Sequence, residues 1–176
     1  MKRGKLTKEY EAVKIIIAID DSPYSQKVIE SVAKRQWPDT AQFKILTVLE
    51  PVCVEPEDNG DFKELLEQVY HRRRESAHKL LNHARDQLLK VADEGRVHFE
   101  IREGIPKHEI VDCAVEWNAD KIMLGAHGHG ICPHNVIGGV SRNVAATAPC
   151  TVEIVRPRQD SHKGHAAKSG SAVVAQ

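Results

Sequence analysis

Short segments rich in apolar residues alternate along this chain with longer segments in which apolar and polar residues mix. The short segments have four to seven residues, a length typical of strands, and cover 13–19, 43–49, 97–101, 121–124 and 151–155. The segments between them predict helices at about 23–36, 61–92, 106–117 and 140–146. Ser22-Pro23 is typical of a helix start. This alternation predicts a doubly wound, Rossmann-like α/β fold with a parallel sheet and helices on both faces.

Composition narrows the classes of function that the chain can have. Its 176 residues carry 25 basic and 25 acidic side chains, a balance that argues against nucleic-acid binding. The longest apolar run, 15–19, is too short to span a membrane, and the N-terminal residues lack the apolar core of a secretory signal. Four cysteines without a C-x-x-C pair indicate reduced thiols, so we expect a cytoplasmic protein. We expect one domain over 13–156, an N-terminal extension over 1–12 and a flexible tail over 157–176.

The ends of the predicted strands bring carboxylates and glycines to one edge of the sheet. In doubly wound sheets, ligands bind at the carboxyl ends of the strands, where the strand order reverses. Asp20 and Asp21 follow the first strand, Val48 lies near the end of the second, and the glycine-rich segment 125–139 follows the fourth. Glycines let backbone amides approach an anion, but this segment matches neither G-x-x-x-x-G-K-[ST] nor G-x-G-x-x-G. Spacing alone therefore leaves a phosphate site and a tight turn both open.

The glycine-rich segment and four flanking motifs resemble one known family. Gly125-x-x-Gly128, nine residues and then Gly138 are similar to the G-2x-G-9x-G-[ST] nucleotide motif of universal stress proteins. The flanking motifs are IAIDDSPYS at 17–25, ILTVLEP at 45–51, ADKIMLGAHG at 119–128 and APCTVEIV at 148–155. They occur in the family's order, so the resemblance covers about 13–156, nearly the whole predicted domain.

The resemblance implies a sheet order of 3-2-1-4-5, a homodimer, and membership of either an ATP-binding or a nucleotide-free subclass. In the ATP-binding subclass, Asp20 would face the adenosine, the backbone of Val48 would meet the adenine, and the glycine segment would line the phosphates. The predicted cofactor-binding residues are Asp20, Asp21, Val48, Leu124, Gly125, His127, Gly128, Gly138, Gly139 and Ser141. The expected cofactor is ATP or AMP, with Mg²⁺ or Mn²⁺ held beside a phosphate by Asp20 and Asp21. Two copies would pair through the last strand, Thr151 to Val155, whose sheet edge is otherwise bare.

One position departs from the family motif. Gly139 stands where the family has Ser or Thr, so a hydroxyl that would bond a phosphate is missing, although Ser141 offers one two residues later. The alternative function is therefore a nucleotide-free dimer that acts through contacts with an unknown protein partner. A third hypothesis is a metal-binding loop, because four side chains that can ligate zinc lie within eight residues: His127, His129, Cys132 and His134.

Two further expectations concern enzyme activity and the arginine-rich run in the longest predicted helix. No Ser-His-Asp or Cys-His set can be argued from spacing, so we expect a binding protein with at most slow ATP hydrolysis. The run HRRRES, 71–76, interrupts the apolar stripe of the longest predicted helix. We interpret this run as a solvated turn with extended arginine stems rather than as an anion site.

Overall fold

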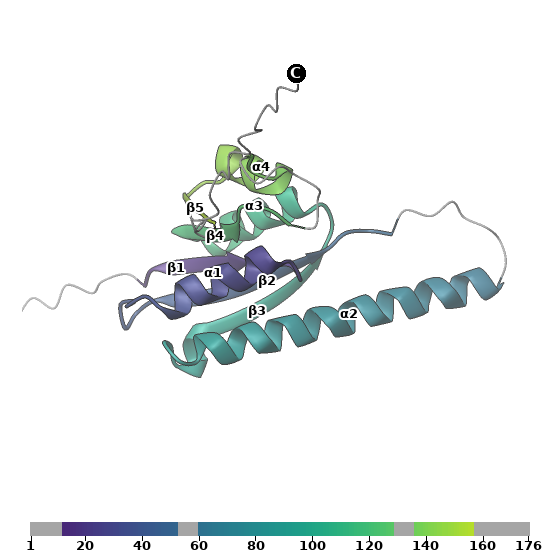
Figure 1. Cartoon of the computed structure of the whole chain (residues 1–176), viewed down its shortest axis with the longest axis horizontal. Helices are drawn as coiled ribbons and strands as arrows, with labels where there is room; N and C mark the ends of the chain where they lie inside the picture. The colour runs from purple at the N-terminus through teal and green to yellow at the C-terminus, as the bar shows by residue number, and fades with distance from the viewer. Residues whose placement is uncertain (1–11, 53–59, 129–135, 157–176) are drawn as a thin grey trace, which may run out of the picture.

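Strands and helices alternate throughout the computed structural model, which describes residues 12–52, 60–128 and 136–156. The elements are β1 (Lys14–Ala18), α1 (Pro23–Ala33), β2 (Gln42–Leu49), α2 (Gly60–Leu88), the 3-10 turn η1 (Glu94–Arg96), β3 (Val97–Glu103), α3 (Pro106–Trp117), β4 (Lys121–Gly125), α4 (Gly139–Thr147) and β5 (Thr151–Val155). Figure 1 shows their arrangement. The predicted tail, and all of the predicted extension except Ala12, lie outside the described residues.

The five strands form one parallel sheet in the order β3-β2-β1-β4-β5. The predicted fold class and strand order are therefore confirmed. β1 is the central strand, and Ile17 pairs with Ile45 of β2 on one side and with Met123 of β4 on the other. Both faces of this strand are covered, which is why its sequence is a nearly continuous apolar run rather than an alternating one.

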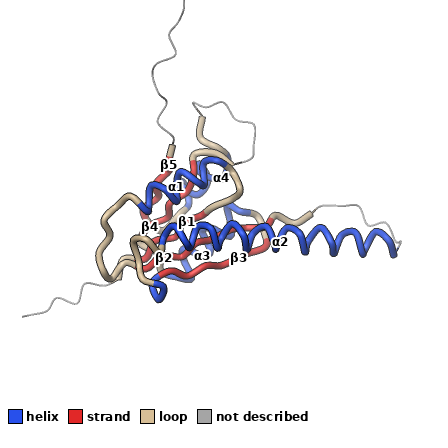
Figure 2. Tube along the Cα trace, turned by 60° about the horizontal axis from the view of Figure 1, so that its bottom comes forward, coloured by secondary structure: helices blue, strands red, loops and turns tan. Residues whose placement is uncertain are grey.

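Helices cover both faces of the sheet (Figure 2). Ile15 and Ile17 of β1 belong to the core shared with α1 and α2, whereas Ile16, between them in sequence, belongs to the core shared with α3 and α4. All three side chains are 0% exposed. Successive strand side chains point to opposite faces, so this single run of isoleucines joins two helical layers to one sheet.

The helix α2 is longer than the sheet that it covers. Its 29 residues rise about 1.5 Å each, which gives about 43 Å, whereas the eight residues of β2 span about 26 Å. The N-terminal part of α2 therefore extends beyond the ends of the strands (Figure 1). Leu65 in this part is 58% exposed, and Leu81, over the sheet, is 0% exposed. Among the described residues, none of the helices combines the length and apolar character that crossing a bilayer requires.

Candidate functional site

A cleft of about 1110 Å³ opens at the carboxyl ends of β1, β2 and β4. The middle of α2 lines one side of it, and the N-terminal parts of α3 and α4 line the other. All ten residues predicted from the sequence are among those that line it: Asp20, Asp21, Val48, Leu124, Gly125, His127, Gly128, Gly138, Gly139 and Ser141. The fold thus brings together, in one cleft, residues that are up to 121 positions apart in the sequence, from position 20 to position 141.

The carboxylate of Asp20 is held by the first turn of α1. Its Oδ1 accepts hydrogen bonds from the Ser22 N–H at 3.1 Å, from the Ser25 hydroxyl at 2.6 Å and from the Ser22 hydroxyl. Ser25 also accepts a hydrogen bond from the Asp20 N–H at 2.8 Å. Oδ2 lies on the side of Gly128, 2.6 Å from the position that a Cβ atom on that glycine would take. The fold therefore satisfies Oδ1 and presents Oδ2 as an acceptor at the cleft.

The backbone of Val48 faces the space beyond the end of β1. The Leu46 carbonyl accepts a hydrogen bond from the Ile19 N–H at 2.9 Å, whereas the Leu49 carbonyl accepts one from the Gly104 N–H, on the β3 side, at 3.0 Å. Successive residues of a strand point their backbone groups to alternate sides, so Val48 shares the β1 side with Leu46. β1 has already ended at this level. A backbone donor and acceptor therefore lie side by side at the cleft, an arrangement that can pair with the edge of an adenine.

The glycines of the cleft serve different purposes. A Cβ atom at Gly125 would lie 2.7 Å from Cβ of Tyr24, so this glycine allows α1 to pack closely on the end of β4. A Cβ atom at Gly138 would lie 3.2 Å from the Ala126 carbonyl oxygen, which accepts a hydrogen bond from the Gly138 N–H at 2.8 Å. Gly139 is different, because a Cβ atom there would have nothing within 4 Å. A side chain at position 139 would fit without displacing its neighbours.

The first turn of α4 presents backbone amides to the cleft. Its N-cap residue is Gly138, and no side chain caps the helix. The first amides of a helix have no partner within it and carry partial positive charge, so they form a site suited to an anion. The Ser141 hydroxyl in this turn is buried and donates to the Gly125 carbonyl oxygen at 2.6 Å. The hydroxyl that the sequence offers in place of the one missing at Gly139 therefore already donates within the fold.

The ring of His127 is buried beside Tyr24. It is 6% exposed, and the two ring centres are 4.8 Å apart. Its Nδ1 has no hydrogen-bond partner among the described residues. The other three residues of the hypothetical metal loop, His129, Cys132 and His134, lie outside the described residues. In the part of the chain that the structure describes, no three His, Cys, Asp or Glu side chains are grouped as a metal site would need.

One wall of the cleft comes from α2 and was missed by the sequence analysis. The residues of this wall share one helical face at spacings of i, i+1, i+4, i+5 and i+8: Arg72, Arg73, Ser76, Ala77 and Leu80. The run 71–76 is helical, as the predicted helix over 61–92 requires, and most of its side chains are exposed, as expected for a solvated turn. The interpretation did not foresee that Arg72 and Arg73 line the cleft. The signal in the sequence is the helical spacing of these polar residues with Ala77 and Leu80, which puts them on one face of the helix.

The sequence of this chain is similar to those of known proteins. A family model described as "Universal stress protein family" matches residues 12–156. Universal stress protein A homolog 1 of Coxiella burnetii is 31% identical over 141 residues, which are 78% of this chain and 92% of the relative.

Solved structures give the same result for the fold. UspA from Lactobacillus plantarum has a TM-score of 0.67 at 24% identity, over 84% of this chain and 99% of that one. A universal stress protein in complex with cAMP has a TM-score of 0.56 at 19% identity, over 83% and 98%. An Arabidopsis thaliana family protein with AMP bound has a TM-score of 0.54 at 18% identity, over 84% and 94%. At these identities the likeness shows the fold alone.

Proposed function

Because the chain belongs to the universal stress protein family, we propose that it is a stress-response or signalling module that binds an adenine nucleotide in this cleft. ATP, with Mg²⁺ or Mn²⁺, is the ligand that we propose first, and AMP the second. The AMP and cAMP in the two solved relatives support the adenine nucleotide as the ligand class. We assign the chain no catalytic residues and expect at most slow hydrolysis of bound ATP.

The order of three kinds of group along the cleft supports this proposal. A backbone donor and acceptor at Val48 lie at the end of β2, the Asp20 carboxylate lies at the end of β1, and the α4 amides lie beside the end of β4. These three strands are neighbours in the sheet, in the order β2-β1-β4. The order along the cleft is therefore base edge, hydroxyl acceptor, anion site, which is the order of base, ribose and phosphate in a nucleotide.

Different residues of the chain would contact the base, the ribose and the phosphates of the nucleotide. Val48 would hold the adenine edge through its backbone, and Oδ2 of Asp20 would accept hydrogen bonds from ribose hydroxyls. The α4 amides would meet the phosphates. A divalent cation bound here would neutralise phosphate charge, and the carboxylates of Asp20 and Asp21 would hold it.

The alternative is a nucleotide-free dimer that acts through a protein partner, and one observation favours it. Position 139 lacks the family's hydroxyl, and the nearby Ser141 hydroxyl donates to the Gly125 carbonyl oxygen. The phosphates would then be met without a hydroxyl donor from this turn. Both candidates include a homodimer formed through β5, which lies at an edge of the sheet.

Native mass spectrometry and calorimetric titration separate the two candidates. The protein purified under native conditions is examined for a co-purifying nucleotide or metal, and is then titrated with ATP, AMP and cAMP, with and without Mg²⁺. We expect binding of at least one of these ligands, and tighter ATP binding with the metal. Absence of both co-purifying nucleotide and measurable heat would favour the nucleotide-free dimer. Co-purifying zinc would instead favour the metal-binding loop.

A further inference from the structure

The cleft that we propose for the nucleotide has an uneven distribution of charge. Three carboxylates line it, those of Asp20, Asp21 and Glu50, and each would repel a phosphate group. The glycine segment contributes no lysine, and the α4 amides supply a partial charge equivalent to about half a proton charge. Among the described residues that line the cleft, the arginines and lysines are Arg72 and Arg73 alone. The positive charge that a phosphate chain needs must therefore come from α2 or from a bound cation.

The side chains of three consecutive arginines of α2 lie at different positions around the helix, near the ends of the strands. The Arg74 guanidinium pairs with Glu103, the last residue of β3, with Nε 3.0 Å from Oε1. Arg73 donates from Nη1 to the carbonyl oxygen of Glu50, just after β2, at 2.6 Å. Each step back along a helix turns the side chain by about 100°. Arg74 lies at β3 and Arg73 at β2, and Arg72 lies another 100° around the helix, on the side away from β3, where it lines the cleft.

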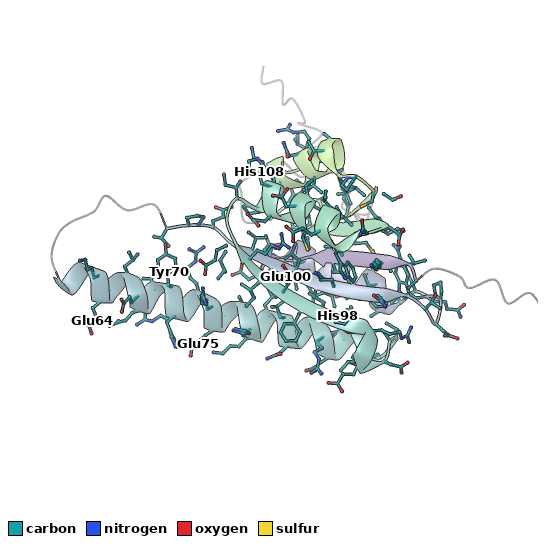
Figure 3. All side chains as sticks on the ribbon, turned by 180° about the vertical axis from the view of Figure 1, so that it is seen from behind. Glu64, Tyr70, Glu75, His98, Glu100 and His108 are labelled. Carbon is teal, nitrogen blue, oxygen red and sulfur yellow. The ribbon has the colours of Figure 1, made fainter. Side chains whose placement is uncertain are left out.

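Around α2, the nearest neighbours of Arg72 in the following turn are Glu75 and Ser76, three and four residues later. Figure 3 shows Tyr70 on the side of α2 that faces the sheet, and Glu64 and Glu75 on the opposite side. Ser76 lies one turn after Arg72 on the same side of the helix and also lines the cleft. In the described part of the chain, no ion pair joins Arg72 to a carboxylate, whereas Arg74 pairs with Glu103. The Arg72 guanidinium is therefore available to an anion in the cleft.

We propose that Arg72 is the side chain that contacts the phosphate chain of the nucleotide, and that it sets the preference of the cleft for ligands with more phosphate groups. This inference rests on the proposed function. Arg72 lies across the cleft from the α4 amides, so the phosphates would lie between a guanidinium and a helix N-terminus. A guanidinium offers five N–H donors in a planar fork that matches phosphate oxygens. Arg73, held by the Glu50 carbonyl, keeps α2 at the end of β2 and so positions Arg72.

The test is a calorimetric titration of the parent protein, Arg72→Gln and Arg74→Gln with adenosine, AMP, ATP and inorganic tripolyphosphate, all without added metal. Arg74 is the matched control, because it is a neighbouring arginine of the same helix that pairs with Glu103 and does not line the cleft. We expect Arg72→Gln to bind ATP about 10- to 150-fold more weakly, as for the loss of one charge-assisted hydrogen bond. The loss should be smaller for AMP and absent for adenosine. Arg74→Gln should bind all four ligands as the parent does, and melting temperatures should confirm that both variants are folded.

The outcomes separate this inference from the proposed function. Equal ATP binding by Arg72→Gln and the parent would overturn the role of Arg72 and leave nucleotide binding intact. Equal losses for adenosine and ATP would also overturn it, because they would mean that Arg72 acts on the base or on the fold. If the parent binds tripolyphosphate through Arg72 but none of the adenine ligands, the proposed function fails and the anion contact stands. If the parent binds none of the four ligands, both are wrong.

Discussion

Gly128 lies so close to Asp20 that a small change there would alter the cleft. A Cβ atom there would lie 2.6 Å from Oδ2 of Asp20, so any side chain must displace the oxygen that we assign to the ribose. We expect Gly128→Val to abolish nucleotide binding and to leave the fold largely intact, because Asp20 is a side chain at the edge of the sheet rather than part of the core. Calorimetric titration and thermal melting of the variant measure the two effects.

Gly95 provides the control for this substitution. A Cβ atom at Gly95 would have nothing within 4 Å, and this residue lies in η1, outside the cleft lining. Gly95→Val should bind nucleotide as the parent does. Undiminished binding by Gly128→Val would show that the Asp20 carboxylate does not contact the ligand in the proposed way.

Position 139 offers the opposite change, a gain of binding. Space is open around the Cβ position of Gly139, so Gly139→Ser would place a hydroxyl at the start of α4 without a clash. We expect ATP binding to tighten by up to about 10- to 150-fold, the range for one hydrogen bond to a charged group. Titration of Gly139→Ala beside Gly139→Ser separates the hydroxyl from the backbone effect of losing a glycine. Equal affinities for the two variants would contradict the prediction.

Among the secondary-structure elements, β5 is joined by an ion pair to Arg35, two residues after the end of α1. Glu153 accepts a hydrogen bond from Nη1 of Arg35 at 2.8 Å, and its carboxylate also lies 3.3 Å from Nζ of Lys121 on β4. The Arg35 hydrogen bond is the main reason that the pKa of Glu153 lies below its usual 4.5, and Lys121 lowers this pKa further while partial burial opposes both. Folding therefore favours the ionised carboxylate, which links stability to pH.

The sign of this linkage gives a prediction for Glu153→Gln. A carboxyl whose pKa is lower in the folded state stabilises the fold above its unfolded pKa, and that stabilisation is lost as the pH falls through the folded pKa. We expect the variant to be less stable than the parent at pH 7 by about 1 kcal/mol, as for a half-exposed ion pair. The difference in the free energy of unfolding should shrink as the pH falls below 4.5. Urea denaturation at a series of pH values measures it.

A surface glutamate serves as the comparison for that series. Glu94 pairs with Arg85, but its side chain is 75% exposed, so solvent screens the pair. Glu94→Gln should leave the free energy of unfolding nearly unchanged across the same pH range. A difference between Glu153→Gln and the parent that did not shrink at all as the pH fell below 4.5 would mean that the substitution acts through packing rather than through charge.

The elements also show where sequence reasoning succeeds and where it stops. The apolar run around Ile16 predicts a buried strand because both of its faces must be covered, and the structure has β1 there. The same logic fails for α2, where Leu65 continues the apolar stripe but is 58% exposed. Periodicity shows which face of a helix is apolar, but not whether the sheet is long enough to cover it. The wall formed by Arg72 and Ser76 follows from that length difference, and so the sequence analysis did not find it.

The candidate site was predictable for a different reason. Asp20, Val48 and the glycine segment directly follow or end strands, and strand ends converge at one edge of a parallel sheet whatever the details of packing. The bonding partners of each group were not predictable. That the Ser141 hydroxyl donates to the Gly125 carbonyl depends on where α4 packs, which no local pattern specifies.

At the scale of the whole molecule, we predict a homodimer from the open edge of β5. The Thr151 N–H donates to Asp120 and the Val155 carbonyl accepts from Ala126, so residues 151, 153 and 155 direct their backbone groups toward β4. Val152 and Ile154 direct theirs to the open edge. We expect two copies to pair antiparallel along this edge about a two-fold axis. Light scattering should then report about twice the chain mass of 19.6 kDa.

Val152→Pro tests the pairing without breaking the sheet. Proline removes the N–H of Val152, which points away from β4, and leaves the bonds between β4 and β5 in place. We expect a folded protein whose mass by light scattering is about that of one chain. A dimer that survived this change, or a parent that stayed monomeric when concentrated, would place the interface elsewhere or remove it.

The projection of α2 beyond the sheet has a consequence for hydrogen exchange. Amides near Leu81 are covered by the core, whereas those near Leu65 belong to turns with little tertiary support. One continuous helix should therefore exchange its amide hydrogens at two very different rates, with the boundary near the arginines that line the cleft. A ligand that contacts this wall would move the boundary toward the N-terminal end of α2. Measuring deuterium uptake along α2 would therefore show directly whether a ligand is bound in the cleft.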